Sequence, residues 1–340
     1  MQSGNGEIPP AYRRIVSLYG IIWLMNAVFL LCPWLLTSQH SATKHFLGLF
    51  ARSTIHAPQL LKPLFVSIEA GVELLGPLNV AMFMATIATV IGLSLLFRFS
   101  VVFVSIFGFL YSLLLWLTIE GLGFPYTNGQ TDPSVMPAYA ICFIFIFAVS
   151  FRQKNITRNM NEKLWAVGRI AFGLLWLFDA ILKWLPAFMF HFDSQITSQL
   201  PGQPSWIVAW LHLVLAIISF VGPTIFAIII ALVETAIALS LLTRFALPYM
   251  APLAILYSLS VWCTAETFGG PYSLSGTGVR GNVIGNIIIY VIPLLMIFAN
   301  IHSEQGSQKL FRNLKSLFHC ERLTTGAQKH SSRRPTWSGD

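Results

Sequence analysis

The chain has 340 residues, of which 55% are hydrophobic and only 10% are charged, and its formal net charge is +8. A soluble domain carries about 25% charged residues, so this composition excludes an ordinary soluble protein. Apolar runs of about 20 residues recur along the chain, and each is long enough to cross the roughly 30 Å hydrocarbon layer of a bilayer. The sequence therefore predicts an all-α polytopic membrane protein.

The positive charge is typical of membrane orientation rather than of nucleic-acid binding, because the basic residues cluster beside the apolar runs. We therefore expect membrane lipids, and no nucleic acid, as partners. Cys32, Cys142, Cys263 and Cys320 are scattered, without a CxxC motif or histidines at metal-ligand spacing. Glycine-rich phosphate loops are also absent from the sequence, so it predicts neither a metal site nor a nucleotide site.

Eight membrane-spanning helices are predicted in chain order, interrupted by two long segments, 38–75 and 190–222. The predicted spans are 15–37, 77–97, 100–119, 135–151, 166–189, 223–243, 246–265 and 281–301. Segment 38–75 is too polar to span, and its second part, Leu60–Leu75, is predicted to form a helix at the membrane interface. In the tail, Gln308–Arg322 has apolar residues on one helical stripe and basic residues away from it, which predicts an amphipathic helix on an anionic membrane surface.

Lysine and arginine counts in the short loops predict the orientation. The N-terminus, the connector 152–164 and the C-terminal tail are rich in these residues, so both termini are expected in the cytoplasm. The domain organisation that follows is a polar segment 1–12, a first four-helix unit 13–151, the basic connector 152–164, a second four-helix unit 165–302, and a basic amphipathic helix with a disordered tail at 303–340.

An internal repeat relates the two four-helix units. Gly76–Tyr126 matches Gly222–Tyr272 without a gap, and about 21 of the 51 positions are identical. An even number of spans in each unit makes the two copies parallel, related by an axis along the membrane normal. The first copy is the more degenerate one.

Three ionisable residues lie well inside predicted spans of the second unit, away from the span ends: Asp179, Lys183 and Glu234. Each would cost roughly 2.5–3.5 kcal/mol at the centre of a membrane helix, so such residues usually face the protein interior and pair. Asp179 and Lys183 are four residues apart, which places them on one helix face. The aligned residues of the first unit are Asn26, Leu30 and Ala88. We predict that the trio forms the catalytic site and shares or relays a proton; the alternative is that Lys183 only neutralises one acid and joins two helices.

Four further residues are weaker candidates for substrate binding or for a supporting position: His212, Arg244, Glu266 and Tyr272. Arg244 and Glu266 have counterparts in Arg98 and Glu120, and this persistence in both copies favours an architectural role. Tyr272 ends a glycine- and proline-containing turn at the predicted outer face, and a tyrosine there is typical of a headgroup anchor. His212 lies on an apolar outer segment. It is either a proton donor at the mouth of the site or an interfacial histidine whose hydrogen bonds are satisfied.

With these motifs identified, the second unit resembles the DoxX/DoxD-like membrane proteins. The resemblance rests on Arg169, Gly173 and Lys183 in the first helix of the unit, and on Glu234 and Arg244 in the second. The Glu-x-x-Gly-x-Pro-Tyr ending of the third helix is similar to the DoxD branch, the membrane subunit of thiosulfate:quinone oxidoreductase. The resemblance covers about 165–300, and 15–150 as a degenerate copy that departs at the lysine and glutamate positions.

The resemblance implies a quinone-coupled oxidation of a small sulfur anion such as thiosulfate. In this hypothesis Lys183 meets the anion, while Glu234 and Asp179 take up protons or bind the quinone head group. It also implies quinone as cofactor, a second redox subunit as partner, and a bacterial or archaeal cytoplasmic (inner) membrane. The alternative is a non-catalytic membrane component, either the scaffold of a redox complex or a small-solute or proton carrier, and the lack of a recognisable redox centre in the sequence favours it. The sequence leaves the oligomeric state open.

Overall fold

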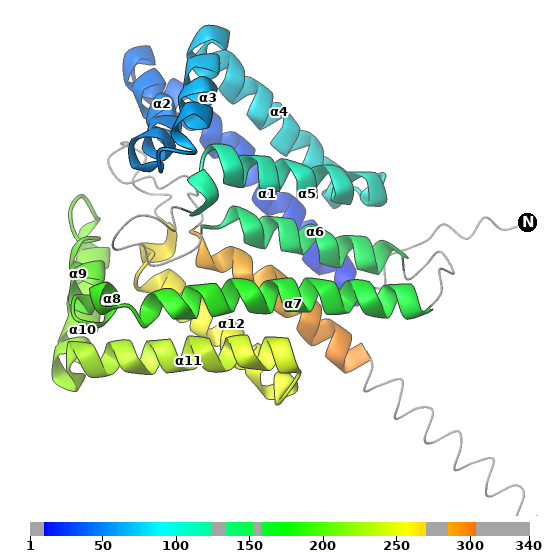
Figure 1. Ribbon diagram of the computed structural model, residues 1–340, viewed down its shortest axis with the longest axis vertical. Coiled ribbons are helices and arrows are strands. Elements are labelled where there is room, and N and C mark those ends of the chain that lie inside the picture. The colour runs from blue at the N-terminus through cyan, green and yellow to red at the C-terminus, as the bar shows by residue number, and fades with distance from the viewer. Residues whose placement is uncertain (1–9, 124–133, 152–157, 270–284, 304–340) are drawn as a thin grey trace, which may run out of the picture. The chain divides into compact units, whose positions relative to one another are not determined.

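The computed structural model describes residues 10–123, 134–151, 158–269 and 285–303. Within these ranges all regular secondary structure is helical (Figure 1). The chain divides into two compact parts, Met1–Ile297 and Phe298–Asp340. The first part contains the helices α1–α12 and the site described below. The helices are α1 (Pro10–Leu36), α2 (Gln39–His56), α3 (Lys62–Leu75), α4 (Pro77–Leu96), α5 (Val101–Thr118), α6 (Met136–Phe151), α7 (Arg158–Lys183), α8 (Pro186–Met189), α9 (Phe192–Thr197), α10 (Ser205–Val221), α11 (Pro223–Thr243) and α12 (Leu247–Cys263), with 3-10 turns η1 (Gly121–Gly123) and η2 (Thr267–Gly269).

Five helices are long and apolar enough to cross a membrane, judged by length and composition. These spans are Tyr12–Leu36, Pro77–Leu96, Val101–Thr118, Met160–Lys183 and Pro223–Thr243. Shorter apolar helices occupy Met136–Ser150, Ser205–Val221, Leu247–Cys263 and Ile287–Ser303. The all-helical prediction is confirmed for the residues that the structure describes, and the apolar helices fit an integral membrane protein. Five of the eight predicted spans fall on the long helices, and the other three fall on shorter ones.

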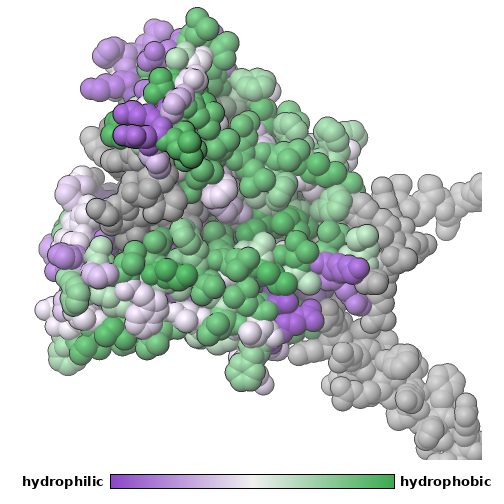
Figure 2. Space-filling model, viewed as in Figure 1, coloured by the Kyte–Doolittle hydropathy of each residue, from purple (hydrophilic) through white to green (hydrophobic). Residues whose placement is uncertain are grey.

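The outward faces of these helices carry the apolar side chains that a lipid environment requires. Large hydrophobic residues such as Phe83, Phe103, Ile225 and Leu232 are exposed. Figure 2 shows hydrophobic residues across much of the visible surface, whereas hydrophilic residues gather over α2 and α3 and, in a second group, near the right-hand ends of α7 and α11. Such extended apolar surface is rare on soluble proteins and is expected where helices face hydrocarbon.

The boundaries of α7 differ from the predicted span of 166–189. The helix begins at Arg158, so its first turns lie in the segment predicted as a connector, and it ends at Lys183. Pro186 then opens the short helix α8. Proline lacks the backbone N–H that continues a helix and disfavours helical geometry in the residue before it, which accounts for the earlier end. The end matters because Lys183 thereby lies in the last turn of α7 instead of well inside a helix.

Four helices run side by side through contacts of α5 with α6, α6 with α7, and α7 with α11 (Figure 1). The chain enters α11 through Gly222, whose φ of 96° suits glycine, followed by Pro223 at the first helical position. It leaves α11 through Arg244 and Ala246, both in the left-handed region with φ of 65° and 52°. This tight turn brings α12 back against α11 and determines which residues of the two helices face each other.

Candidate functional site

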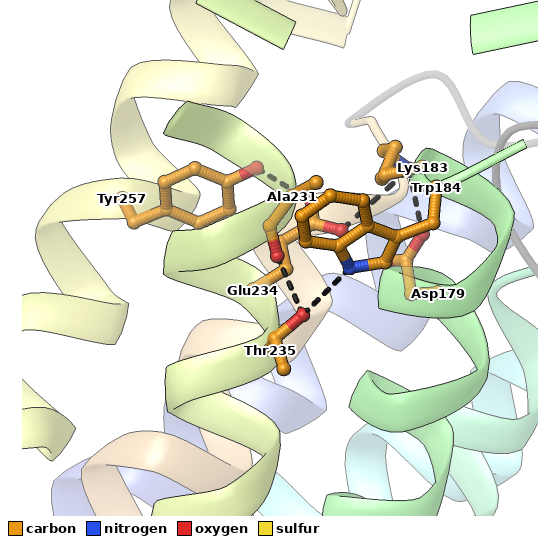
Figure 3. Close-up of polar contacts among 7 residues, drawn as sticks. All are labelled: Asp179, Lys183, Trp184, Ala231, Glu234, Thr235 and Tyr257. Atoms are coloured by element: carbon orange, nitrogen blue, oxygen red, sulfur yellow. Dashed lines mark hydrogen bonds and ion pairs between the residues drawn. The ribbon is translucent and has the colours of Figure 1, made fainter. Parts of the chain in front are cut away.

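The three ionisable residues predicted from the sequence meet in the structure (Figure 3). Lys183 Nζ lies 2.7 Å from Asp179 Oδ1, one helical turn away on α7, and 3.8 Å from Glu234 Oε2 on α11. Asp179, Lys183 and Glu234 are 4%, 9% and 2% exposed. We call these residues the charge cluster. Their proximity agrees with the spacing argument, while a catalytic role for them stays a prediction.

Tyr257 on α12 adds a fourth polar group that the sequence argument missed. Its phenol donates a 2.5 Å hydrogen bond to Glu234 Oε1. Its ring lies 5.9 Å from that of Trp176, which in turn contacts Tyr290 at 5.4 Å between centroids. The internal repeat does indicate this position, because the residue of the first unit that aligns with Tyr257 is also a tyrosine, Tyr111.

A second polar link joins α7 and α11 next to the charge cluster. Trp184 Nε1 donates to Thr235 Oγ1 at 3.1 Å, and the threonine hydroxyl donates to the carbonyl of Ala231 at 2.6 Å (Figure 3). Neither Trp184 nor Thr235 lines the cavity described next. The link therefore holds the two helices together independently of the charges.

The charge cluster opens into a cavity of about 530 Å³. This volume lies within the range of about 300–1,000 Å³ typical of small-molecule sites. Most of the apolar part of its wall comes from α8–α11 and includes Phe188, Phe192, Ile196, Val214, Ile218, Phe226, Ile229, Ile230 and Val233. The polar part includes Asp179, Lys183, Glu234, Tyr257, Ser260, Thr264, Glu266, Thr267, Gln195, Ser198, Gln199 and Gln203. A molecule that combines an apolar body with hydrogen-bonding atoms would match both parts.

Helices α8, α9 and α10 cover the cavity as one packed layer. Their side chains Phe188, Phe192, Ile207 and Leu211 belong to a buried apolar cluster that also contains Ala227 of α11. Trp210 Nε1 on α10 donates a 2.7 Å hydrogen bond to the carbonyl of Cys263, at the end of α12. The apolar wall of the cavity is thereby held against the helices that carry the polar groups.

Glu266 lines the same cavity, but its carboxylate is engaged by the backbone. Oε1 accepts hydrogen bonds from the N–H groups of Asn286 and Ile287 at 3.0 Å, and Oε2 accepts from Ile287 at 3.1 Å. Glu120 binds the backbone N–H groups of Val135 and Met136 in the same manner. An acid in this position caps the start of the following helix and favours its dipole. This geometry agrees with the architectural role expected from the repeat.

Two other sequence candidates, Arg244 and His212, lie away from the cavity. Arg244 is exposed at the C-terminal cap of α11, and His212 is exposed on α10 while its neighbour Leu211 is buried. Neither residue lines the cavity. Tyr272 lies outside the described residues, as does the predicted amphipathic helix of the tail. Arg169, part of the family resemblance, donates through its guanidinium to the carbonyls of Leu241 and Leu242 and so caps the end of α11.

The groups present are suited to proton transfer and to hydrogen bonding. In the described ranges, no group of three or more His, Cys, Asp or Glu side chains could hold a metal ion.

Comparison with protein-family models, with curated proteins and with solved structures finds no match. The argument for function therefore rests on the residues of the site.

Proposed function

We propose that this integral membrane protein is DoxX/DoxD-like, with eight spans in two parallel four-helix units and both termini in the cytoplasm of a bacterial or archaeal cell. The three shorter apolar helices within predicted spans support the count of eight. Paired junctions support the repeat, because the positive φ angles at Gly76, Arg98 and Leu122 recur at the aligned Gly222, Arg244 and Phe268. The similar capping by Glu120 and Glu266 supports it further.

Within this protein we propose that the cavity of the second unit binds a quinone. The observation that carries the proposal is that Lys183 and Tyr257, two hydrogen-bond donors, converge on Glu234 in an apolar-walled cavity of about 530 Å³. A quinone head group is a planar apolar ring with carbonyl oxygens that accept hydrogen bonds. Lysine offers three donors, and the Phe188 ring, whose centroid lies 5.3 Å from Lys183 Nζ, offers an apolar face beside them. The residues present therefore fit the group.

A bound quinone would supply the capacity to accept two electrons and two protons. A small sulfur anion such as thiosulfate would be the electron source, with a second redox subunit as partner where the chain does not suffice alone. In this proposal Lys183 holds the head group, and a carboxyl group of the charge cluster passes protons to it. The apolar layer of α8–α10 covers one side of the cavity and lowers the effective dielectric constant there, which strengthens the electrostatic interactions within the cluster.

The charge balance changes one detail of the expectation from sequence. Lys183 faces two carboxylates, so the cluster offers no net positive charge to an anion. We therefore assign the quinone, not the sulfur anion, to Lys183. The uncharged amide and hydroxyl groups of Gln199, Gln203 and Thr267 line the same cavity and provide donors for an anion without a carboxylate among them.

Quinone binding to the purified protein in lipid nanodiscs tests the proposal. A short-chain quinone should quench tryptophan fluorescence saturably in the wild type and in Trp184→Phe, which removes a hydrogen bond between the same two helices outside the cavity. The triple variant Asp179→Asn, Lys183→Leu, Glu234→Ala should lose saturable quenching. Thiosulfate-dependent quinone reduction, measured with the protein alone and with native membrane extract, then tests the reaction. Equal quenching in the wild type and the triple variant would reject the quinone site.

A proton carrier is the second candidate function. The observation that favours it is the buried cluster itself, in which one lysine faces two carboxylates, since intramembrane ionisable residues often mark proton pathways. Proteoliposomes that contain a pH-sensitive dye would show proton movement dependent on Glu234 and independent of added quinone. A scaffold role predicts neither proton movement nor quinone binding.

A further inference from the structure

The charge cluster carries an odd number of charges. With Asp179, Glu234 and Lys183 all ionised, its net charge is −1. From the facing elements, α12 contributes Tyr257, the segment after α12 contributes Glu266, and the last apolar helix contributes Tyr290. Among the described cavity residues, α8–α10 contribute no charged side chain. A net charge buried in an apolar surrounding is costly, and one bound proton would remove it.

The geometry distinguishes the three carboxyl groups that line the cavity. Asp179 forms the short ion pair with Lys183, at 2.7 Å. Glu266 accepts three backbone hydrogen bonds, which favour its ionised form. Glu234 is the acid with the longer distance to Lys183, 3.8 Å from Oε2, and its other oxygen accepts the phenol of Tyr257. A proton on Glu234 Oε2 therefore leaves the 2.7 Å ion pair of Asp179, the backbone hydrogen bonds of Glu266 and the hydrogen bond from Tyr257 in place.

We propose that Glu234 stores one exchangeable proton on Oε2 and that Tyr257 positions this carboxyl through Oε1, while Asp179 and Lys183 stay an ionised pair. The proposal extends the proposed function by naming the group that holds a proton. It rests on the proposed function only in that a bound quinone is the recipient of this proton. Glu234 is thus the proton-carrying residue of the site, and Tyr257 is its positioning residue.

The cavity gives this proton a way in and out. Tyr257, Ser260 and Thr264 line it from one face of α12, at spacings of three and four residues. A volume of about 530 Å³ has room for more than ten water molecules, each of which occupies roughly 30 Å³ in the liquid. The two hydroxyls donate to carbonyls of their own helix, so their oxygens remain able to accept hydrogen bonds from such water.

Difference infrared spectroscopy of the purified full-length protein, without quinone and across a pH step, tests the proposal. The wild type should show one protonated-carboxyl band that disappears at high pH and is absent from Glu234→Gln. Tyr257→Phe should move that band to higher frequency, because its carbonyl oxygen loses a hydrogen bond. Tyr111→Phe is the matched control and should leave the band unchanged. Tyr111 is aligned with Tyr257, but the residue aligned with Glu234 is Ala88, which has no carboxyl group.

The proposal is overturned if the wild type has no such band, if the band persists in Glu234→Gln, or if Tyr257→Phe leaves its position unchanged. The Tyr257→Phe arm retains every charge of the cluster, so it remains informative should Glu234→Gln fold poorly. Because quinone is absent from the measurement, a chain that binds no quinone can still show the band. A chain that binds quinone without the band would retain the proposed function and refute this inference.

Discussion

Removing the positive charge of the cluster should destabilise the protein more than removing all three charges. Lys183→Met leaves the carboxyls of Asp179 and Glu234 buried without their cation. At an effective dielectric constant of about 20, Coulomb's law gives roughly 6 kcal/mol for the contact with Asp179 at 2.7 Å, and roughly 4 kcal/mol more for the contact at 3.8 Å when Glu234 is ionised. Desolvation of the charges offsets much of this attraction, and breaking a buried pair by removing one partner typically costs about 3–5 kcal/mol.

The triple variant carries the residues of the first unit at the same three positions. Its substitutions are Asp179→Asn, Lys183→Leu and Glu234→Ala, after Asn26, Leu30 and Ala88. It leaves no buried charge, and its main loss is the hydrogen bond of Tyr257, worth about 1–3 kcal/mol if the phenol stays unpaired. We therefore expect Lys183→Met to be about 2 kcal/mol less stable than the triple variant, which is roughly 30-fold in the unfolding equilibrium.

Equilibrium unfolding of both variants in mixed micelles, followed by tryptophan fluorescence, measures this difference. Trp184→Phe serves as the control for the α7–α11 contact, because its hydrogen bond to Thr235 involves no charge. A Lys183→Met variant as stable as the wild type would show that the cluster is not held by its cation. A triple variant less stable than Lys183→Met would refute the reasoning, because removing the remaining buried charges would then have increased the loss.

Three further predictions concern topology, the capping acids and a close backbone approach. Reporter fusions after residue 160 and at the C-terminus should indicate the cytoplasm and one after residue 125 the outside; an outside signal from the C-terminus would refute the eight-span topology. Glu120→Gln and Glu266→Gln should each lose about 1 kcal/mol of stability, since each weakens the capping of a helix start. If only Glu266→Gln loses quinone binding, Glu266 is a residue of the binding site and not a capping residue alone. Gly285→Ala should cost about 1–3 kcal/mol in unfolding experiments, because the added Cβ would lie 2.5 Å from Glu266 Oε2 and the residue has a φ of +96°. Gly48→Ala is the control and should not destabilise the protein, since no atom lies within 4 Å of the added Cβ. Equal stability of the two variants would contradict this packing.

The sequence predicted the charge cluster because the physics that forces it is local and strong. Ionisable groups in apolar helices must find partners, and the spacing of Asp179 and Lys183 leaves one helix face for them. Glu234 was the remaining charge far from the ends of a predicted span in the same unit, so its partners could be inferred without knowing how the helices pack. The all-helical fold follows in the same way from repeated apolar runs, since a chain in lipid must satisfy its backbone groups within each helix.

Tyr257 and the cavity depend on tertiary packing that no spacing rule describes. Tyrosines are common in membrane helices, and only the rotation of α12 against α11 decides that this one reaches Glu234. The apolar wall requires α10 to fold back on α12 through the Trp210 contact with the Cys263 carbonyl, between residues far apart in the sequence. The position of His212 in an apolar segment did not indicate which face of α10 would be buried. In the structure His212 lies on the exposed face.

The end of α7 explains why a site could arise in the second unit. In the first unit α1 continues through Pro33 to Leu36, whereas α7 ends at Lys183, before the aligned Pro186. The early end lets α8 and α9 contact α11 and provide the apolar wall of the cavity. It also places Lys183 at the negative end of the α7 dipole, where a cation gains about 0.3–1 kcal/mol at exposed sites and more where it is partly buried. The same break in the helix thus provides the apolar wall of the cavity and stabilises Lys183, which faces both Asp179 and Glu234. This coincidence is the structural reason to expect function from these three residues rather than helix pairing alone.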